Sequence, residues 1–245
     1  MELKIKKNKK GKINVISSPN AWRKYAPPQN PKKQWVDGRS AKTLAEYVFK
    51  NEEKDFCHTI EGVLASLNLN TPQSFKCEPE AKTPFPQSWG TRGARSHDLK
   101  MIGDTDLIIC IEAKVDEPFG EKLSTKRRDA EKKNADGGKN MNLRIDSILD
   151  FLYPKGKPLN AEGLMYQLLS ATAGTILEAK EKGKSNAIAL FVVFKTNNKT
   201  SKNGFAINNS KYKEFCRSLG LSSDGGAIDI DGIKCWIKKV DIDFD

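Results

Sequence analysis

The sequence holds few of the residues that build thiolate or imidazole metal sites. It contains two histidines, His58 and His97, and five cysteines. The cysteines are scattered, odd in number and without a CxxC pair, so we expect neither a structural zinc site nor a disulfide framework. Unpaired thiols are typical of reducing compartments, and we therefore expect a cytoplasmic protein.

Long apolar runs are also missing. No run approaches the roughly 20 residues that span a bilayer, so no membrane partner is expected. The Lys-rich N-terminus lacks the apolar stretch of a secretory signal, which also favours a cytoplasmic protein.

Acidic residues are outnumbered by basic ones. There are 31 Asp and Glu against 42 Lys and Arg, which gives a formal net charge of +11. A surplus of this size attracts polyanions, and nucleic acid is the commonest of them. The alternative is a soluble protein whose basic surface has no such partner.

The chain of 245 residues is long enough for one large domain, and neither a repeat nor a break in composition divides it. Residues 1–34 mix Lys with Pro and Asn. They are predicted to form a basic N-terminal arm, either lying along a phosphate backbone or solvated as a tail. Trp22 and Tyr25 suggest that the later part of the arm docks on the body. Residues 35–245 are predicted to form one domain.

Hydrophobic periodicity predicts the elements of that domain. The segment 187–194 (AIALFVVF) reads as a strand buried on both faces, and the chain ends in a hairpin around Asp231-Gly232. Residues 70–95 are predicted as loop with one short strand near Phe75, and 120–142 as a helix end plus a basic loop. Helices are predicted over residues 40–50, 55–69, 143–152, 161–181 and 208–219. Helices that alternate with strands indicate an α/β or α+β class with a mixed central sheet.

The stretch 96–117, SHDLKMIGDTDLIICIEAKVDE, carries the candidate chemistry. Two apolar-rich runs flank a turn-like segment, 103–106, which predicts a β-hairpin. Side chains alternate between the faces of a strand, so Glu112 and Lys114 project together on one face. Ile109 and Ile111 lie on the other face, toward the core.

The position of Asp98 depends on the length of the hairpin loop. A three-residue loop, 104–106, pairs Gly103 with Leu107 and puts Asp98 directly opposite Glu112, with their Cβ atoms roughly 5 Å apart. A two- or four-residue loop shifts the register by one and sends Asp98 to the other face. A functional site therefore requires an odd loop or a compensating bulge.

Two carboxylates at that distance repel each other unless a cation lies between them. Mg²⁺ binds such oxygen ligands, lowers the pKa of a bound water and neutralises a phosphate. Lys114 could orient or deprotonate that water and stabilise the developing charge. The alternative interpretation is a solvent-facing Glu112–Lys114 pair on an amphipathic strand.

This pattern resembles a known signature. Asp98 followed by Glu112-Ala113-Lys114 resembles the D…(D/E)xK motif of the PD-(D/E)XK, or restriction-endonuclease-like, nuclease superfamily. His97 stands where that motif has a proline. Four segments resemble a bacterial family within the superfamily: WVDGRSAKTLAEYV (35–48), SHDL (96–99), IEAKVDEPFGE (111–121) and YQLLSATAGTILEAK (166–180).

The resemblance implies a restriction-endonuclease-like core, with a mixed central sheet of about four to five strands flanked by helices. It also implies metal-dependent endonucleolytic cleavage of DNA in a restriction or phage-defence setting. By that analogy Asp98 and Glu112 bind Mg²⁺, for which Mn²⁺ can substitute. The Ala113 carbonyl is a candidate third ligand, and Lys114 is the catalytic lysine.

Further positions follow from the same resemblance. Glu46 lies mid-helix, where many such nucleases place an acidic residue that binds metal through water; an ordinary helix-surface Glu is the alternative. Gln167 resembles a polar active-site residue of several branches. Glu117 is expected at the surface or behind the ligands, although it could replace a ligand if the strand ends early. The candidate DNA contacts are Arg92, Arg95, Lys126, Arg127 and Arg128, and for the last three a solvated charge run is the alternative.

The leading hypothesis is thus a Mg²⁺-dependent deoxyribonuclease that acts on double-stranded DNA. The alternative is a non-catalytic nucleic-acid-binding or assembly protein on the same fold, since a fold does not determine function. RNA as the substrate is a further alternative. The resemblance also suggests a homodimer, because many such nucleases cut both strands as symmetric dimers. No base-reading motif is recognisable, so the recognition sequence stays open.

Overall fold

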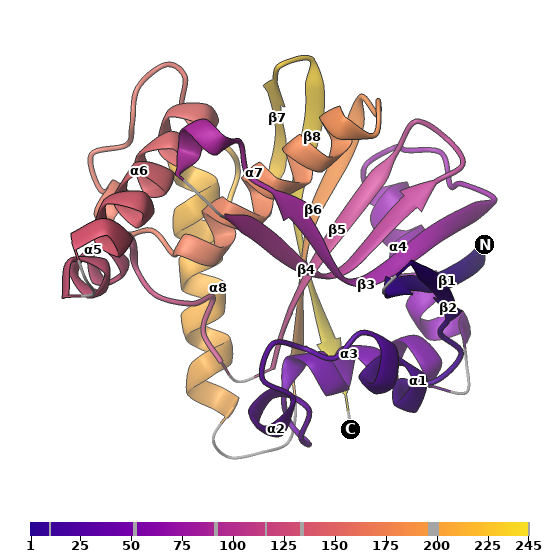
Figure 1. Cartoon of the computed structure of the whole chain (residues 1–245). Coiled ribbons are helices and arrows are strands. Elements are labelled where there is room, and N and C mark those ends of the chain that lie inside the picture. Colours follow the sequence, from indigo (N-terminus) through magenta and orange to yellow (C-terminus); the bar gives the residue numbers. More distant parts are fainter. Residues whose placement is uncertain are drawn as a thin grey trace.

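The computed structural model describes residues 1–9, 11–50, 53–90, 93–115, 117–132, 135–195 and 201–244. Within this part of the chain, eight strands form one mixed sheet in the order β2-β1-β3-β4-β5-β6-β8-β7 (Figure 1). The strands are β1 (Glu2–Lys9), β2 (Lys12–Val15), β3 (Ser74–Pro84), β4 (Ala94–Gly103), β5 (Ile108–Lys114), β6 (Asn186–Lys195), β7 (Gly226–Ile230) and β8 (Ile233–Asp243).

The helices connect and cover these strands. The α-helices are α1 (Pro19–Tyr25), α2 (Pro31–Gln34), α3 (Ser40–Phe49), α4 (Glu53–Ser66), α5 (Leu123–Lys132), α6 (Ala135–Leu152), α7 (Tyr166–Glu181) and α8 (Ser201–Ser218). Two 3-10 turns accompany them, η1 (Gln87–Trp89) and η2 (Ala161–Gly163). No helix in the described ranges is both long and apolar enough to cross a membrane.

The centre of the sheet is an antiparallel meander followed by a parallel crossover. β3, β4 and β5 pair antiparallel in sequence order, and the chain then passes through α7 before β6 pairs parallel to β5. The sheet is mixed, as the sequence predicted. It is larger than the expected four to five strands because β1 and β2 extend one side and the β7–β8 hairpin extends the other.

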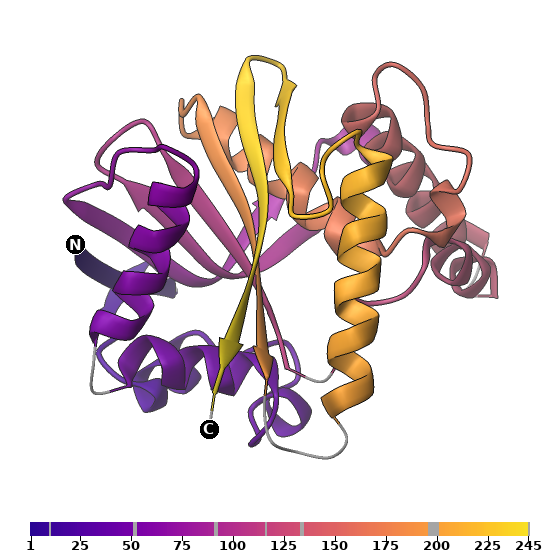
Figure 2. The ribbon, with the colours of Figure 1, turned by 180° about the vertical axis from the view of Figure 1, so that it is seen from behind.

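Two apolar cores lie on opposite faces of the sheet, and each is covered by its own helices (Figures 1 and 2). Helices α6, α7 and α8 pack over one face, where Ile176 and Phe215 meet Phe191 of β6. Helices α1, α3 and α4 pack over the other face, where Leu44 and Phe56 join the opposite side of β5. Every residue of β5 is buried, as expected for a central strand covered by helices on both faces.

The first 34 residues are part of this fold, which corrects the prediction of a separate basic arm. β1 pairs parallel with β3, and Ile5, Ile16 and Trp22 are buried in the core beneath α3 and α4. The docking expected of Trp22 is confirmed. The Lys-rich composition concealed β1 because its lysines alternate with the inward-facing Leu3 and Ile5.

The prediction of loop over residues 70–95 is wrong. Most of that segment is the 11-residue strand β3, in which Phe75, Cys77, Ala81 and Thr83 are buried at alternate positions. Pro79 within it argued against a strand. The β1–β3 pairs end at Cys77, so Pro79 lies beyond them and its missing N–H breaks no bond to β1.

Most of the predicted helices are present with shifted ends. The helix expected over 161–181 is divided into η2 and α7, and the segment 120–142 forms α5 and the start of α6 instead of a basic loop. The terminal hairpin turns at Asp231 and Gly232, which both adopt positive φ angles, 52° and 77°. This is the left-handed geometry that such a tight turn requires.

Candidate active site

The β4–β5 hairpin has the register predicted for a three-residue loop. The Gly103 N–H donates to the Leu107 carbonyl at 3.0 Å, and the strand pairs run to Leu99 opposite Ile111. Continuing this register by one residue puts Asp98 opposite Glu112.

The two strands separate beyond the Leu99–Ile111 pair, and a side chain takes over the backbone ladder. The Ala113 N–H donates to Oδ2 of Asp98 at 2.7 Å, while β5 stays paired with β6 as far as Lys114 opposite Val193. A carboxylate therefore satisfies a buried backbone donor at the point where β4 leaves β5. The opening between the strands exposes Glu112 and Lys114 to a cavity.

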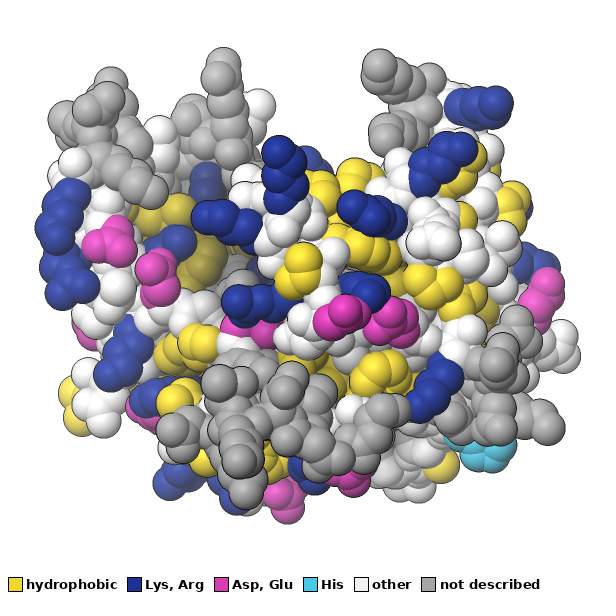
Figure 3. Space-filling model, turned by 90° about the horizontal axis from the view of Figure 1, so that it is seen from below, with side chains coloured by type: hydrophobic (Ala, Val, Ile, Leu, Met, Phe, Trp, Pro, Cys, Tyr) yellow, Lys and Arg dark blue, Asp and Glu magenta, His cyan; other side chains and the backbone are white. Residues whose placement is uncertain are grey.

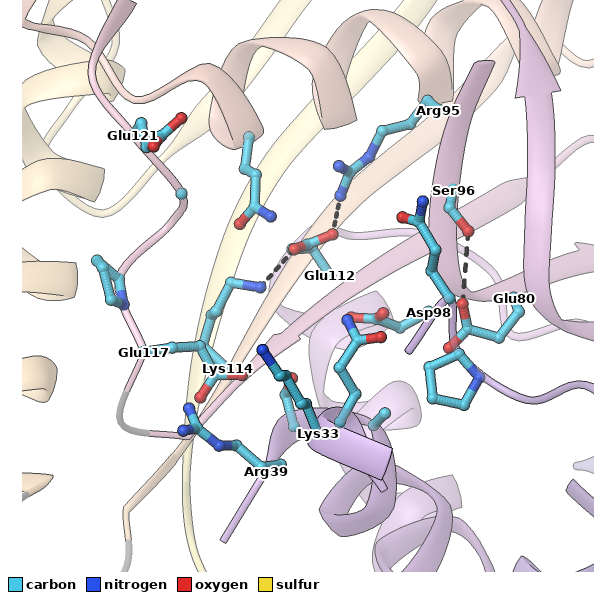
Figure 4. A pocket seen from close by; sticks show the side chains of 18 residues that line it. Lys33, Arg39, Glu80, Arg95, Ser96, Asp98, Glu112, Lys114, Glu117 and Glu121 are labelled. Atoms are coloured by element: carbon cyan, nitrogen blue, oxygen red, sulfur yellow. Dashed lines mark hydrogen bonds and ion pairs between the residues drawn. The ribbon is translucent and has the colours of Figure 1, made fainter. Parts of the chain in front are cut away.

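This cavity has a volume of about 670 Å³. The ends of β3, β4 and β5 form its floor, and the segments around α2 and the start of α3 form one wall (Figure 4). The loop after β5 and the first turn of α7 form the opposite wall. The lining charged and amide side chains are Gln29, Lys33, Gln34, Arg39, Glu80, Arg95, Asp98, Glu112, Lys114, Glu117, Glu121 and Gln167.

Glu112 is held by two cations on the floor of the cavity. Its Oε1 lies 2.6 Å from Nζ of Lys114, and its Oε2 forms an ion pair with the guanidinium of Arg95. Glu112 and Lys114 are only 4% and 6% exposed. The solvent-facing pair considered from the sequence is thus excluded, because both faces of β5 are covered and only the cavity reaches these side chains.

Burial displaces the pKa values of the groups around Glu112. Burial lowers the pKa of Lys114 despite the nearby charges of Asp98 and Glu117. Burial also raises the pKa of Asp98, against the opposing effects of Lys114 and of the Ala113 N–H. The site therefore contains an amine that loses its proton more easily than usual and a carboxyl that loses its proton less easily than usual.

Glu80 is a site residue that sequence reasoning missed. It lies in β3 between Pro79 and Ala81, which pair with the residues on either side of Asp98, so the two carboxylates are cross-strand neighbours. Burial, with the charge of Asp98 beside it, raises the pKa of Glu80 to about 8. Its φ of 46° is unusual for a non-glycine residue. The predicted loop over this segment hid the residue.

Glu117 also lines the cavity. Burial alone would raise its pKa, but the charge of Lys114 and hydrogen bonds from Ser40 and backbone N–H groups lower it overall. The sequence placed this residue at the surface or behind the ligands. In the structure it is a carboxylate of the cavity itself.

Gln167 reaches the cavity from the first turn of α7. It packs against Gly120, where a Cβ would come within 2.9 Å of its Cγ. Gly120 adopts a φ of 71°, so both its backbone and its missing side chain suit this contact. The Oε1 of Gln167 is buried and has no hydrogen-bond partner among the described residues.

A buried polar network supports the wall formed by α7. Glu178 accepts hydrogen bonds from Thr83 at 2.6 Å and Lys100 at 2.7 Å, and His97 lies 3.2 Å from the Thr83 hydroxyl. Burial lowers the pKa of His97 well below its ordinary value, so the imidazole is neutral. His97 therefore anchors α7 to β3 and β4 and does not line the cavity.

The remaining predicted residues lie elsewhere. Glu46 does not line the cavity; it is partly exposed and lies 3.3 Å from Lys42, one turn away on the same helix. Lys126 pairs with Glu121, and Arg92 lies outside the described residues. Arg127 is held by Asp146 and Glu162, while the side chain of Arg128 is 64% exposed. Of the predicted DNA contacts that the structure describes, Arg95 is the one that lines the cavity.

Two cations that the sequence did not single out lie at the cavity instead. Lys33 of α2 and Arg39 before α3 extend toward the opening (Figure 4). Neither has an ion-pair partner among the residues that the structure describes. They contrast with Lys126 and Arg127, whose charges are already balanced by carboxylates.

The residues of the cavity floor have the chemistry that a divalent ion needs, but their side chains are not arranged as a metal site. Asp98, Glu80 and Glu112 supply the oxygen atoms that Mg²⁺ prefers, and burial raises the pKa values of Asp98 and Glu80. In the described ranges, however, no three His, Cys, Asp or Glu side chains converge as a metal site. Both oxygens of Glu112 contact cations of the chain itself.

Residues 15–243 match the family model described as a domain of unknown function, DUF6946, so the chain belongs to that family. No curated protein and no solved structure matches it.

Proposed function

For this member of the DUF6946 family we propose a metal-dependent endonuclease activity that hydrolyses phosphodiester bonds of double-stranded DNA. One observation carries the proposal: Asp98, Glu112 and Lys114 come from two neighbouring strands and meet at one cavity. Asp98 reaches it because β4 and β5 adopt the odd-loop register. The residues of the D…(D/E)xK resemblance are therefore also neighbours in space.

The order of the central elements supports the proposal. A helix precedes the β3–β4–β5 meander, and α7 then leads to β6, which lies parallel to β5. The resemblance to restriction-endonuclease-like nucleases implies a mixed sheet of about four to five strands flanked by helices, and the order β3-β4-β5-β6 within the eight-stranded sheet supports that interpretation. β1, β2, β7 and β8 are additions at its two sides.

Asp98 and Glu112 are the residues proposed to hold Mg²⁺ or Mn²⁺, with the Ala113 carbonyl as a third donor. Glu80 is added to this set as the carboxylate next to Asp98. A divalent ion here would supply a water of lowered pKa and neutralise charge on the phosphate.

Proton transfer and charge stabilisation are assigned to side chains of the protein itself. Glu112 orients the ammonium group of Lys114 at 2.6 Å. Burial lowers the pKa of Lys114, so a larger fraction of this amine than of an exposed lysine is neutral and available to accept a proton from water. When protonated, it can stabilise negative charge on the phosphate that is attacked.

Lys33 and Arg39 are the proposed contacts for the DNA backbone. The acidic floor alone would repel a polyanion, and these two cations at the rim offset that repulsion. Figure 3 shows the face that carries α2 and α3, where Lys and Arg side chains lie among apolar and acidic ones. The proposed substrate thus approaches over the wall formed by α2.

A plasmid-nicking assay with Mg²⁺ tests the proposal. Wild-type protein should convert supercoiled plasmid to open-circular and linear forms, and EDTA should stop the reaction. Glu112→Gln should be inactive, whereas Glu46→Gln, the same change outside the cavity, should retain activity. Equal cleavage by wild type and Glu112→Gln would contradict the site assignment. Structured RNA in a parallel reaction tests the alternative substrate.

A non-catalytic nucleic-acid-binding protein on the same fold is the second candidate. The ion pairs that occupy both oxygens of Glu112 favour it, because a site filled by its own cations needs no metal. Thermal unfolding with and without Mg²⁺ or Mn²⁺ separates the two, since a ligand that binds the native state raises its stability. Metal should stabilise a nuclease and leave the second candidate unchanged.

A further inference from the structure

We infer that Arg95 is a positioning residue that holds the Glu112 carboxylate, and that a divalent ion binds at Glu112 by displacing the Arg95 guanidinium from it. The inference rests on the proposed metal site. It assigns to Arg95 a different role from the DNA contact that its charge suggested.

The first observation is the occupation of Glu112. Lys114 contacts Oε1 and Arg95 contacts Oε2, and Glu112 is 4% exposed. A divalent ion bound to either oxygen would lie close to one of these two positive charges, which opposes its binding while both partners stay. Lys114 is the cation that the proposed reaction needs, so Arg95 is the partner that gives way.

The second observation is that Arg95 is poorly satisfied apart from Glu112. Its side chain is only 10% exposed, and its buried Nε has no hydrogen-bond partner among the described residues. Asp98 and Glu80 also act on its charge, but Glu112 is the carboxylate in direct ion-pair contact with the guanidinium. Losing that pair therefore releases the side chain from its position.

The third observation is a glycine that makes room for Arg95. A Cβ at Gly174 of α7 would lie 2.9 Å from Cγ and 3.0 Å from Cβ of Arg95. Helix α7 therefore lies directly against the stem of Arg95, which limits the directions that the side chain can take. With α7 on this side, the guanidinium points from β4 toward Glu112 on the neighbouring strand, β5.

Competition follows from these contacts. A divalent ion on Oε2 of Glu112 and a guanidinium on the same atom repel each other at short range. The metal affinity of the wild-type protein is therefore reduced by the free energy needed to break the Arg95–Glu112 pair. A variant without that pair should bind metal more tightly, whereas a merely structural Arg95 would leave the affinity unchanged or lower it.

Calorimetric titration of the full chain with Mn²⁺ tests this competition. We expect Arg95→Gln to bind Mn²⁺ about tenfold more tightly than wild type, or about 1.4 kcal/mol at 25 °C. The matched control is Lys100→Met, which removes another buried cation of β4 that pairs with Glu78 and Glu178, away from the cavity. This variant should lose stability without a change in Mn²⁺ affinity.

The outcomes separate the two proposals. If the wild-type protein binds Mn²⁺ and Arg95→Gln binds it equally or more weakly, the role of Arg95 is overturned and the metal site stands. Absence of binding in both proteins would overturn the metal site as well.

If Arg95→Gln does not fold, the wild-type protein still decides the question. The Nε–H resonance of Arg95, assigned by its loss from the spectrum of Arg95→Lys, should shift when Mg²⁺ saturates the site. An unmoved resonance at saturation would contradict the displacement.

Discussion

Asp98 accepts the backbone N–H of Ala113, the residue between Glu112 and Lys114, at 2.7 Å. This single hydrogen bond relates the two strands of the site at the point where their ladder ends. It orients the Asp98 carboxylate toward β5, and it fixes one of its oxygens. Any cation at the site must therefore share the Asp98 carboxylate with the Ala113 N–H.

Replacement of Lys114 by alanine should abolish cleavage while the protein still folds. The amine is the group proposed to transfer the proton, so we expect a loss of at least about 100-fold in rate. Glu112 keeps Arg95 as a partner in this variant, which limits the destabilisation. Plasmid cleavage, with circular dichroism to establish folding, measures both effects. Cleavage at the wild-type rate would remove Lys114 from the mechanism.

Two glycine-to-alanine changes should have opposite effects on stability. At Gly174 the new Cβ would collide with the stem of Arg95 and approach the ring of His97, so we expect a loss of about 1–3 kcal/mol. At Gly62, in the middle of α4, nothing lies within 4 Å of the new Cβ. There the better helix propensity of alanine should stabilise by about 0.5–1 kcal/mol. Urea unfolding of both variants measures these differences, and a stabilising Gly174→Ala would contradict the close approach of α7.

The stability of the protein should depend on pH through Glu80. Its pKa of about 8 in the folded protein lies above the ordinary value of 4.5. Between these values the folded state binds more protons than the unfolded state, so the free energy of unfolding falls as pH rises.

The side chain in the Glu80→Gln variant has no proton to release, so the free energy of unfolding of this variant should not fall with rising pH for this reason. Its Tm relative to wild type should therefore be higher at about pH 8.5 than at about pH 5. Differential scanning calorimetry at the two pH values gives the comparison. A Tm difference that does not change with pH would show that Glu80 titrates normally.

Removal of the two rim cations should weaken DNA binding. We expect Lys33→Ala combined with Arg39→Ala to reduce affinity for all sequences and to lower the salt dependence by about one unit for each lost phosphate contact. Lys126→Ala with Arg128→Ala changes the charge equally on α5, outside the cavity. Fluorescence anisotropy in EDTA compares the two without cleavage. A larger effect of the α5 pair would place the DNA-binding surface on that helix.

Local patterns in the sequence predicted the hairpin but left its register open. Its apolar runs and its short turn were recognisable, and the strand pairs adopt the register of a three-residue loop, one of the loop lengths considered. The strand over 187–194 and the terminal hairpin were also predicted, because the pattern that indicates each of them lies within one continuous segment. The central sheet was recognisable as mixed, but β3 was not, because Pro79 obscured its alternation.

The candidate site contains residues that no local pattern could bring together. Glu80 became visible only once β3 was paired with β4, and Glu46 was assigned to the site although α3 carries it away from the cavity. Lys33 and Arg39 reach the cavity because Trp22 and Trp35 dock their segment on the body. Sequence reasoning about an isolated hairpin has no access to such contacts.

The sequence by itself determined that Glu112 and Lys114 share a face of their strand, because strand alternation is a local property of the chain. Only the tertiary structure decided the electrostatics of that face. Helices cover both sides of β5 and bury Glu112 and Lys114, and α7 directs Arg95 onto the same carboxylate through the space at Gly174. Burial and neighbouring charge depend on segments distant in the chain, and they set the protonation and the partners of the residues that the sequence had identified.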